Sequence, residues 1–96
     1  MKLFDLNHLI ASRHWFHANA ELSLKEVNTS SRIIEELKRL KIPVKDISIK
    51  ATTGVQVDIA GQGPPCLSPR TICLRADIDA LPIIECNPNI SIHIFV

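Results

Sequence analysis

The segment Leu74-Arg75-Ala76-Asp77-Ile78-Asp79-Ala80-Leu81-Pro82 carries two carboxylates two residues apart, directly after the apolar run Thr71-Ile72-Cys73-Leu74. That run is apolar on both faces, which predicts an interior strand covered on two sides. The closing proline stops a strand because it cannot donate to the hydrogen-bond ladder. The carboxyl end of such a strand is a common ligand position in α/β proteins. Asp77 and Asp79 would repel there unless a cation or Arg75 lies between them, so the pattern fits either a solvated turn or a site beside a metal ion.

The first of two helices is predicted over residues 6–17. One face of this helix carries the apolar residues Leu6, Leu9, Ile10 and Phe16. Arg13 and His17 fall on the same face, where polar groups need partners. A structural pair bonded to Glu21 or Glu26 accounts for them, and a functional role is the alternative.

A second helix is predicted from about Leu24 to Lys41. Ser23 and Glu26 have the spacing of a capping box at its start, and Pro43 ends it. Its buried face consists of Val27, Ser30, Ile33, Ile34, Leu37 and Leu40.

Three strands are predicted after the helices. Val44–Lys50 is polar enough for an edge strand, Gly54–Ala60 alternates between apolar and polar residues, and Thr71–Leu74 is the interior strand described above. The fold class is therefore α/β, with two helices followed by three strands, and the layer that they form is incomplete.

Composition indicates a single soluble domain without a charged partner. The chain has 96 residues, 46% of them hydrophobic and 22% charged, and a net charge of +1. This balance excludes nucleic acid and anionic membrane as expected partners, and no segment resembles a membrane span or a secretory signal. Cys66, Cys73 and Cys86 show no C-x-x-C spacing, which favours reduced thiols in a cytoplasmic protein over disulfide or metal roles.

Three motifs together resemble a known family. Leu74–Ile83 with Glu85 resembles the L-R-A-D-M-D-A-L-P-I-x-E segment of the aminoacylase/carboxypeptidase metallopeptidase family, in the amidohydrolase branch that includes hippurate hydrolases and indole-acetyl-amino-acid hydrolases. Ile78 replaces Met in that segment. Residues 13–29 are similar to the R-x-x-x-H-x-x-P-E-L-S…E…T segment, with Ala20 in place of Pro, and Thr53-Gly54-Val55 resembles the family's T-G-V. The resemblance covers residues 10–85.

The resemblance implies a zinc-peptidase-like catalytic domain that hydrolyses the amide bond of N-acyl amino acids. Family members use a pair of divalent ions (Zn, Mn or Co) and a Glu as general base. Asp79 matches the position that orients a metal ligand or the bound ion. Asp77 stands where distant relatives place a metal-binding His, and Arg75 is expected to be structural.

The metal-ligand motifs of the family are missing from this sequence. Family members have Cys-Gly-His-Asp shortly after the D-x-D segment, whereas Asn87 follows Cys86 and His93 stands alone in an apolar tail. We therefore expect residues 1–96 to be a truncated N-terminal portion of the catalytic domain, family-like over 10–85 and divergent over 86–96, with no metal bound and no activity alone. An N-acyl amino acid is the expected substrate of the completed enzyme. A non-catalytic truncated protein, or a small binding or regulatory partner of a full-length paralogue, is the alternative.

Overall fold

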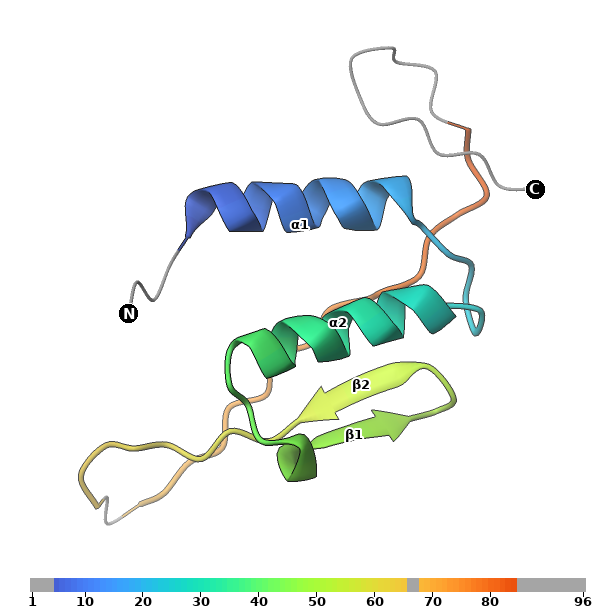
Figure 1. Cartoon of the computed structure of the whole chain (residues 1–96). Helices are drawn as coiled ribbons and strands as arrows, with labels where there is room; N and C mark the ends of the chain where they lie inside the picture. The colour runs from blue at the N-terminus through green and yellow to red at the C-terminus, as the bar shows by residue number, and fades with distance from the viewer. Residues whose placement is uncertain (1–4, 66–67, 85–96) are drawn as a thin grey trace.

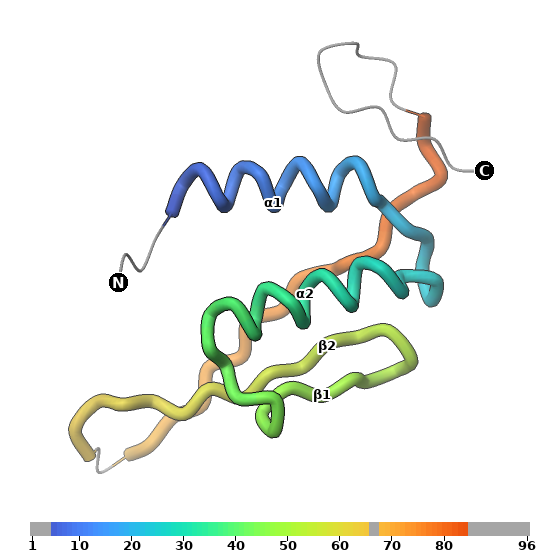
Figure 2. Tube along the Cα trace, viewed as in Figure 1, coloured from blue at the N-terminus to red at the C-terminus, as the bar shows by residue number. Residues whose placement is uncertain are grey.

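The structure is a computed structural model that describes residues 5–65 and 68–84. Its elements are, in chain order, α1 (Leu6–Ala18), α2 (Val27–Arg39), the short 3-10 helix η1 (Val44–Asp46), β1 (Ile47–Lys50) and β2 (Gly54–Val57). Helix α2 lies between α1 and the β-hairpin, and the segment after residue 68 runs back past α2 toward the end of α1 (Figures 1 and 2). No helix within the described ranges is long and apolar enough to cross a membrane.

Helix α1 confirms the predicted first helix. Its N-cap is Asp5, whose carboxylate accepts from the His8 N–H at 3.2 Å. At the other end the Asn19 side chain donates to the Trp15 carbonyl oxygen at 2.8 Å. The element thus begins and ends on local hydrogen bonds that its own sequence provides.

Polar and cation–π contacts join α1 to α2. The Arg32 guanidinium lies 5.2 Å from the centroid of the Trp15 ring, and His8 Nε2 lies 2.7 Å from Glu36 Oε2. Arg32 and Arg39 also contact the Glu36 carboxylate, at 3.2 and 3.0 Å. Burial raises the pKa of Glu36, but the hydrogen bonds and charges of His8 and Arg39 outweigh it, so that this pKa lies below its ordinary value.

Helix α2 begins three residues later than predicted. Leu24 has a φ of 63°, outside the right-handed helical region, and the cap residue is Glu26, which makes no side-chain capping bond. The predicted capping box of Ser23 and Glu26 is therefore wrong. The Glu26 carboxylate instead accepts from the Thr53 hydroxyl, a tertiary contact that the local pattern could not indicate.

The end of α2 is a Schellman motif. The Lys41 N–H donates to the Lys38 carbonyl at 2.9 Å, and the Ile42 N–H donates to the Leu37 carbonyl at 3.0 Å. Lys41 occupies the left-handed position of this motif, with a φ of 62°, where a side chain is disfavoured and glycine is common.

Replacing Lys41 by glycine is therefore expected to stabilise the protein, by about 0.5–1 kcal/mol. The matched control is Lys38→Gly, which removes the same side chain from inside the last turn of α2 and is expected to destabilise by about 1 kcal/mol. Urea unfolding followed by circular dichroism measures both. Equal destabilisation by the two substitutions would contradict this account of the helix end.

The two strands form an antiparallel hairpin. Ile47 pairs with Val57 and Lys50 pairs with Gly54, and the turn residues Ala51 and Thr52 have positive φ values of 47° and 74°. A Cβ on Gly54 would lie 2.8 Å from the Lys50 carbonyl oxygen, so glycine is required at this closure of the hairpin. The predicted edge strand over residues 44–50 is confirmed only in its second half, because η1 occupies residues 44–46. Strand β2 ends at Val57 rather than at Ala60.

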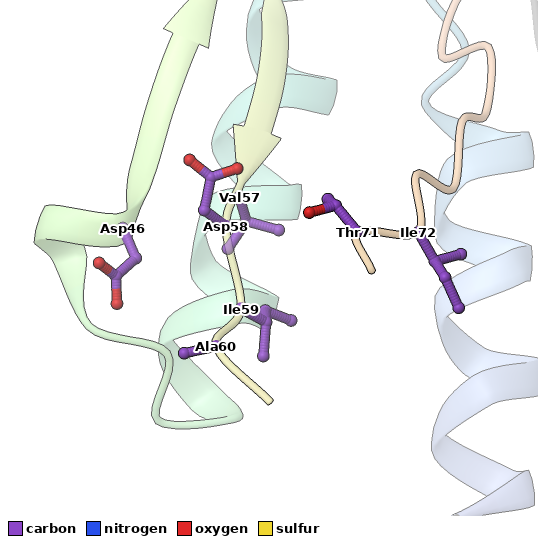
Figure 3. Close-up of a pocket in the computed structure, with 7 residues that line it drawn as sticks. All are labelled: Asp46, Val57, Asp58, Ile59, Ala60, Thr71 and Ile72. Atoms are coloured by element: carbon purple, nitrogen blue, oxygen red, sulfur yellow. The ribbon is translucent and has the colours of Figure 1, made fainter. Parts of the chain in front are cut away.

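The predicted third strand is wrong for this structure. Thr71–Leu74 is extended but has no strand partner, and the side chains of Ile72 and Leu74 are 85% and 94% exposed. A groove of about 470 Å³ separates these residues from the end of β2. Figure 3 shows Thr71 and Ile72 across this groove from Val57, Asp58 and Ile59. A strand needs a neighbour to pair its backbone N–H and C=O groups, and here the segment lies beside β2 without pairing. The α/β class is confirmed by the two helices and the two-stranded sheet alone.

The interior of the described part of the chain is polar. Its buried side chains are those of Glu26, Thr29, Ser30 and Thr53, and none of its hydrophobic residues is buried. The radius of gyration is 16.3 Å, compared with about 13 Å for a compact domain of similar length. The arrangement is therefore open, and hydrogen bonds rather than a closed apolar core connect its layers.

Candidate functional site

The D-x-D segment lines a cleft against both helices. The cleft has a volume of about 430 Å³. Its walls come from α1, from α2 and from the extended segment after residue 75, and the residues are Arg13, Phe16, Thr29, Ile33, Ala76, Asp77, Ile78 and Asp79. The structure thus places both predicted site residues, Asp77 and Asp79, in one concave surface.

The two carboxylates of the segment have different partners. Arg75 Nη2 lies 2.6 Å from Asp77 Oδ1, and both side chains are largely exposed. Asp79 is exposed and makes no hydrogen bond or ion pair within residues 5–65 and 68–84. Arg75 is thus the partner of Asp77, whereas Asp79 keeps its oxygens available.

The described residues do not fit a metal ion by themselves. No group of three or more His, Cys, Asp or Glu side chains comes together in the part of the chain that the structure describes, whereas a catalytic zinc ion has about three protein ligands. Asp77 and Asp79 supply at most two, and one of them is already paired with Arg75. Glu85, of the family-like motif, and Cys86 and His93 lie outside the described residues.

Glu21 does not line the cleft, but its carboxylate binds Thr29, which does, and the sequence pattern did not predict this contact. Glu21 Oε1 accepts from the Thr29 N–H at 2.6 Å and from the Thr29 hydroxyl at 2.7 Å, and Oε2 accepts from the Asn28 N–H at 3.2 Å. The N–H groups of Asn28 and Thr29 belong to the first turn of α2 and have no partner within the helix. A carboxylate is favoured there because the N-terminus of a helix carries partial positive charge.

The hydrogen bonds to Glu21 outweigh the effect of its burial. Burial raises the pKa of the Glu21 carboxyl, but donation from the Thr29 side chain and from the backbone of Thr29, Asn28 and Val27 lowers it further, so that the pKa lies below its ordinary value. The carboxylate is therefore ionised at neutral pH.

The backbone of Glu21 is bonded to the residue that follows the D-x-D segment. The Ala80 N–H donates to the Glu21 carbonyl oxygen at 2.8 Å, and Ala80 follows Asp79 in the chain. One residue of the loop between the helices thus contacts both the start of α2 and the D-x-D segment.

A second polar network holds the hairpin on α2. The Thr53 hydroxyl donates to Glu26 Oε2 at 2.6 Å, and the Ser30 hydroxyl contacts the Thr53 carbonyl oxygen and the Glu26 carbonyl oxygen. The signal for this network was the polar Ser30 on the apolar face of the second helix. Glu26, Thr29 and Thr53 also belong to the motifs that carry the family resemblance.

The expected pairing of Arg13 with Glu21 or Glu26 is not formed. The Arg13 guanidinium lies 2.7 Å from His14 Nε2 instead, because the two glutamates bind the start of α2 and Thr53. Arg13 nevertheless lines the cleft beside Asp77 and Asp79.

Comparisons with known proteins agree with the motifs. The chain is 40% identical over 81 residues to an N-acetyldiaminopimelate deacetylase of Oenococcus oeni, a match that covers 80% of this chain and 20% of that protein. It is 44% identical over 79 residues to an N-acetyl-L-cysteine deacetylase of Bacillus subtilis, covering 80% of this chain and 17% of the relative. A thermostable carboxypeptidase of Saccharolobus solfataricus is 40% identical over 77 residues, covering 80% of this chain and 18% of the relative.

The matched region is a small part of each relative. The chain spans about a fifth of the length of these curated proteins. No family model matches it, and no solved structure matches it. The sequence identity and the three motifs nevertheless agree on one assignment: this chain belongs to the amidohydrolase and peptidase family of these deacetylases and carboxypeptidases.

Proposed function

We propose that this chain forms one wall of the active site of an enzyme that hydrolyses the amide bond of N-acyl amino acids. The observation that carries the proposal is the position of Asp77 and Asp79 in a cleft against α1 and α2. The relatives, whose names give deacetylation of N-acetyl amino acids and carboxypeptidase activity, support this reaction class, because both activities break an amide bond to an amino acid.

The two carboxylates have separate roles in this proposal. Asp79 orients a metal ligand or the ion itself, since its oxygens have no other partner within the described ranges. Asp77 is held by Arg75 and contributes negative charge beside the site. The family resemblance implies a divalent ion, and the further ligands of such an ion have to come from outside the described residues.

The exposed apolar residues support the same proposal. Ile72 and Leu74 precede the D-x-D segment and are almost fully exposed, although such side chains are usually buried. We propose that they pack against the remainder of a family-length protein, in which Thr71–Leu74 gains strand partners.

A chimera tests the proposed function. Residues 10–85 of this chain replace the matched segment of the Bacillus subtilis N-acetyl-L-cysteine deacetylase, and hydrolysis of N-acetyl-L-cysteine is measured with added zinc, manganese or cobalt. We expect the chimera to be active. We expect no hydrolysis by the 96-residue chain alone or by the deacetylase without its matched segment.

The outcome is interpretable only if the chimera folds. Its folding and metal content are therefore measured alongside activity, by circular dichroism and elemental analysis. A folded, metal-loaded chimera without activity would contradict the proposal and favour the alternative of a non-catalytic partner of a longer family member.

A further inference from the structure

Glu21, in the loop between α1 and α2, is hydrogen-bonded to the segment that carries the candidate site. Glu21 is bound through its carboxylate to the first turn of α2 and through its carbonyl oxygen to the Ala80 N–H. Its neighbours Leu22 and Leu24 are exposed, so that apolar packing of these two side chains does not hold the loop in place.

Binding of the Glu21 carboxylate restricts the position of the Glu21 carbonyl oxygen, because both groups belong to the same residue. Three hydrogen bonds hold the Glu21 side chain against Thr29 and Asn28, and hydrogen bonds to an ionised acceptor are stronger than neutral ones. With the side chain held in this way, the carbonyl oxygen has a defined position next to the Ala80 N–H. The segment that carries Asp79 is then bound to α2 through Glu21.

Thr29 belongs both to this connection and to the cleft. It donates twice to Glu21 and lines the cleft together with Asp77 and Asp79. The D-x-D segment has no regular secondary structure, and the backbone ladder of a sheet does not fix its position. The hydrogen bond from Ala80 to Glu21 can fix the position of this segment, because the Glu21 side chain is itself bound to α2.

We infer that Glu21 is a positioning residue for the D-x-D segment: its carboxylate binds the start of α2, and its carbonyl oxygen then holds the Ala80 peptide so that Asp79 faces the cleft. The inference deepens the proposed function, on which its catalytic consequence rests. The positioning itself is a property of this chain that can be measured without any activity.

If Glu21 only capped α2 and did not position the D-x-D segment, a different result would be expected. Loss of a cap destabilises α2, and amide exchange then rises throughout the helix and the segments that pack on it. Loss of the positioning contact raises exchange at Ala80 selectively, because the Ala80 N–H bonds to Glu21 and to no part of α2.

The test is residue-specific amide hydrogen exchange by NMR on the full 96-residue chain. Glu21→Ala is expected to speed exchange at Ala80 by about tenfold or more relative to Ile33 in the middle of α2, as loss of a single local contact does. Glu21→Gln retains an acceptor for Thr29 but loses the charge, and it is expected to speed exchange at Ala80 by a smaller factor, of about threefold. The control Glu35→Gln removes the same charge from an exposed position on α2 and is expected to leave Ala80 unchanged.

Each outcome decides the inference. Exchange at Ala80 and Ile33 that rises by the same factor in Glu21→Ala, or an unchanged Ala80, would overturn it. If Glu21→Ala does not fold, Glu21→Gln carries the test with a smaller selective increase, of about threefold at Ala80 relative to Ile33, and a zero increase overturns the inference.

The chimera separates this inference from the proposed function. In an active chimera, Glu21→Ala is expected to lower kcat by about tenfold with little change in KM, and Glu21→Gln is expected to recover most of the rate. An inactive parent chimera would count against the proposed function alone, because the exchange measurement on the chain itself still decides the positioning role.

Discussion

Replacing Thr53 by valine is expected to lower the free energy of unfolding by about 2–3 kcal/mol, the largest stability effect of a single substitution that the structure indicates. Thr53 and Glu26 are 7% and 5% exposed, and the Thr53 hydroxyl donates to the Glu26 carboxylate at 2.6 Å. Valine has the same shape but no donor. It would leave a buried carboxylate oxygen without this hydrogen bond, which costs more than the loss of an exposed one.

The effect should be concentrated at the contact between the hairpin and α2. Within the described residues the interior is polar and no hydrophobic side chain is fully buried, so apolar packing offers little compensation. We expect the loss in urea unfolding followed by circular dichroism, together with faster amide exchange in β1 and β2 than in α1.

Two variants control for the change in side-chain chemistry. Thr53→Ser keeps the hydroxyl and is expected to recover most of the stability. Thr52→Val makes the same substitution one residue earlier at an exposed position, where surface changes usually alter stability by less than about 0.5 kcal/mol. Equal losses for Thr52→Val and Thr53→Val would contradict the assigned role of the buried hydroxyl.

Asp79→Asn is expected to have the largest effect on catalysis. In the active chimera described above, we expect it to lower activity by about 10–100-fold, the range observed when a residue that orients metal ligands is changed. Asparagine preserves the size of the side chain and removes its charge. Because Asp79 is exposed and has no described partner, stability should change by less than about 0.5 kcal/mol.

The control for Asp79 is another exposed carboxylate of the same chain. Asp58 lies at the separate groove beyond β2 (Figure 3), and Asp58→Asn is expected to leave the activity of the chimera unchanged. The steady-state rate and the metal content of both variants are measured together. Full activity of the Asp79→Asn chimera with bound metal would contradict the role proposed for Asp79.

Local sequence patterns predicted the elements whose hydrogen bonds are local. The first helix is confirmed because Asp5 and Asn19 bond its ends within a few residues. The second helix is confirmed in its body, and the first two predicted strands are confirmed over Ile47–Lys50 and Gly54–Val57. Hydrophobic periodicity and turn residues depend only on residues that are close together in the chain, and these can be read from the sequence alone.

The predictions were wrong where the structure depends on a residue far away in the chain. Glu26 has the spacing to cap Ser23, yet its carboxylate binds Thr53, 27 residues away, and the free N–H groups of α2 bind Glu21 instead. The apolar run Thr71–Leu74 has the composition of an interior strand. A strand forms only where another strand pairs with its backbone, and that partner is a property of the tertiary arrangement.

The sequence by itself determined the family, which the relatives support, and it indicated Asp77 and Asp79 as candidate carboxylates, because they lie in a motif that can be read without coordinates. Only the tertiary structure decided how that motif is held: beside α1 and α2 rather than at the end of a paired strand, with Arg75 on Asp77 and Glu21 bonded to Ala80. The physical reason is the range of the interactions. Residue type and spacing are local quantities, whereas the hydrogen bonds that hold the segment join groups up to 59 residues apart in the chain, and folding alone brings such groups within bonding distance.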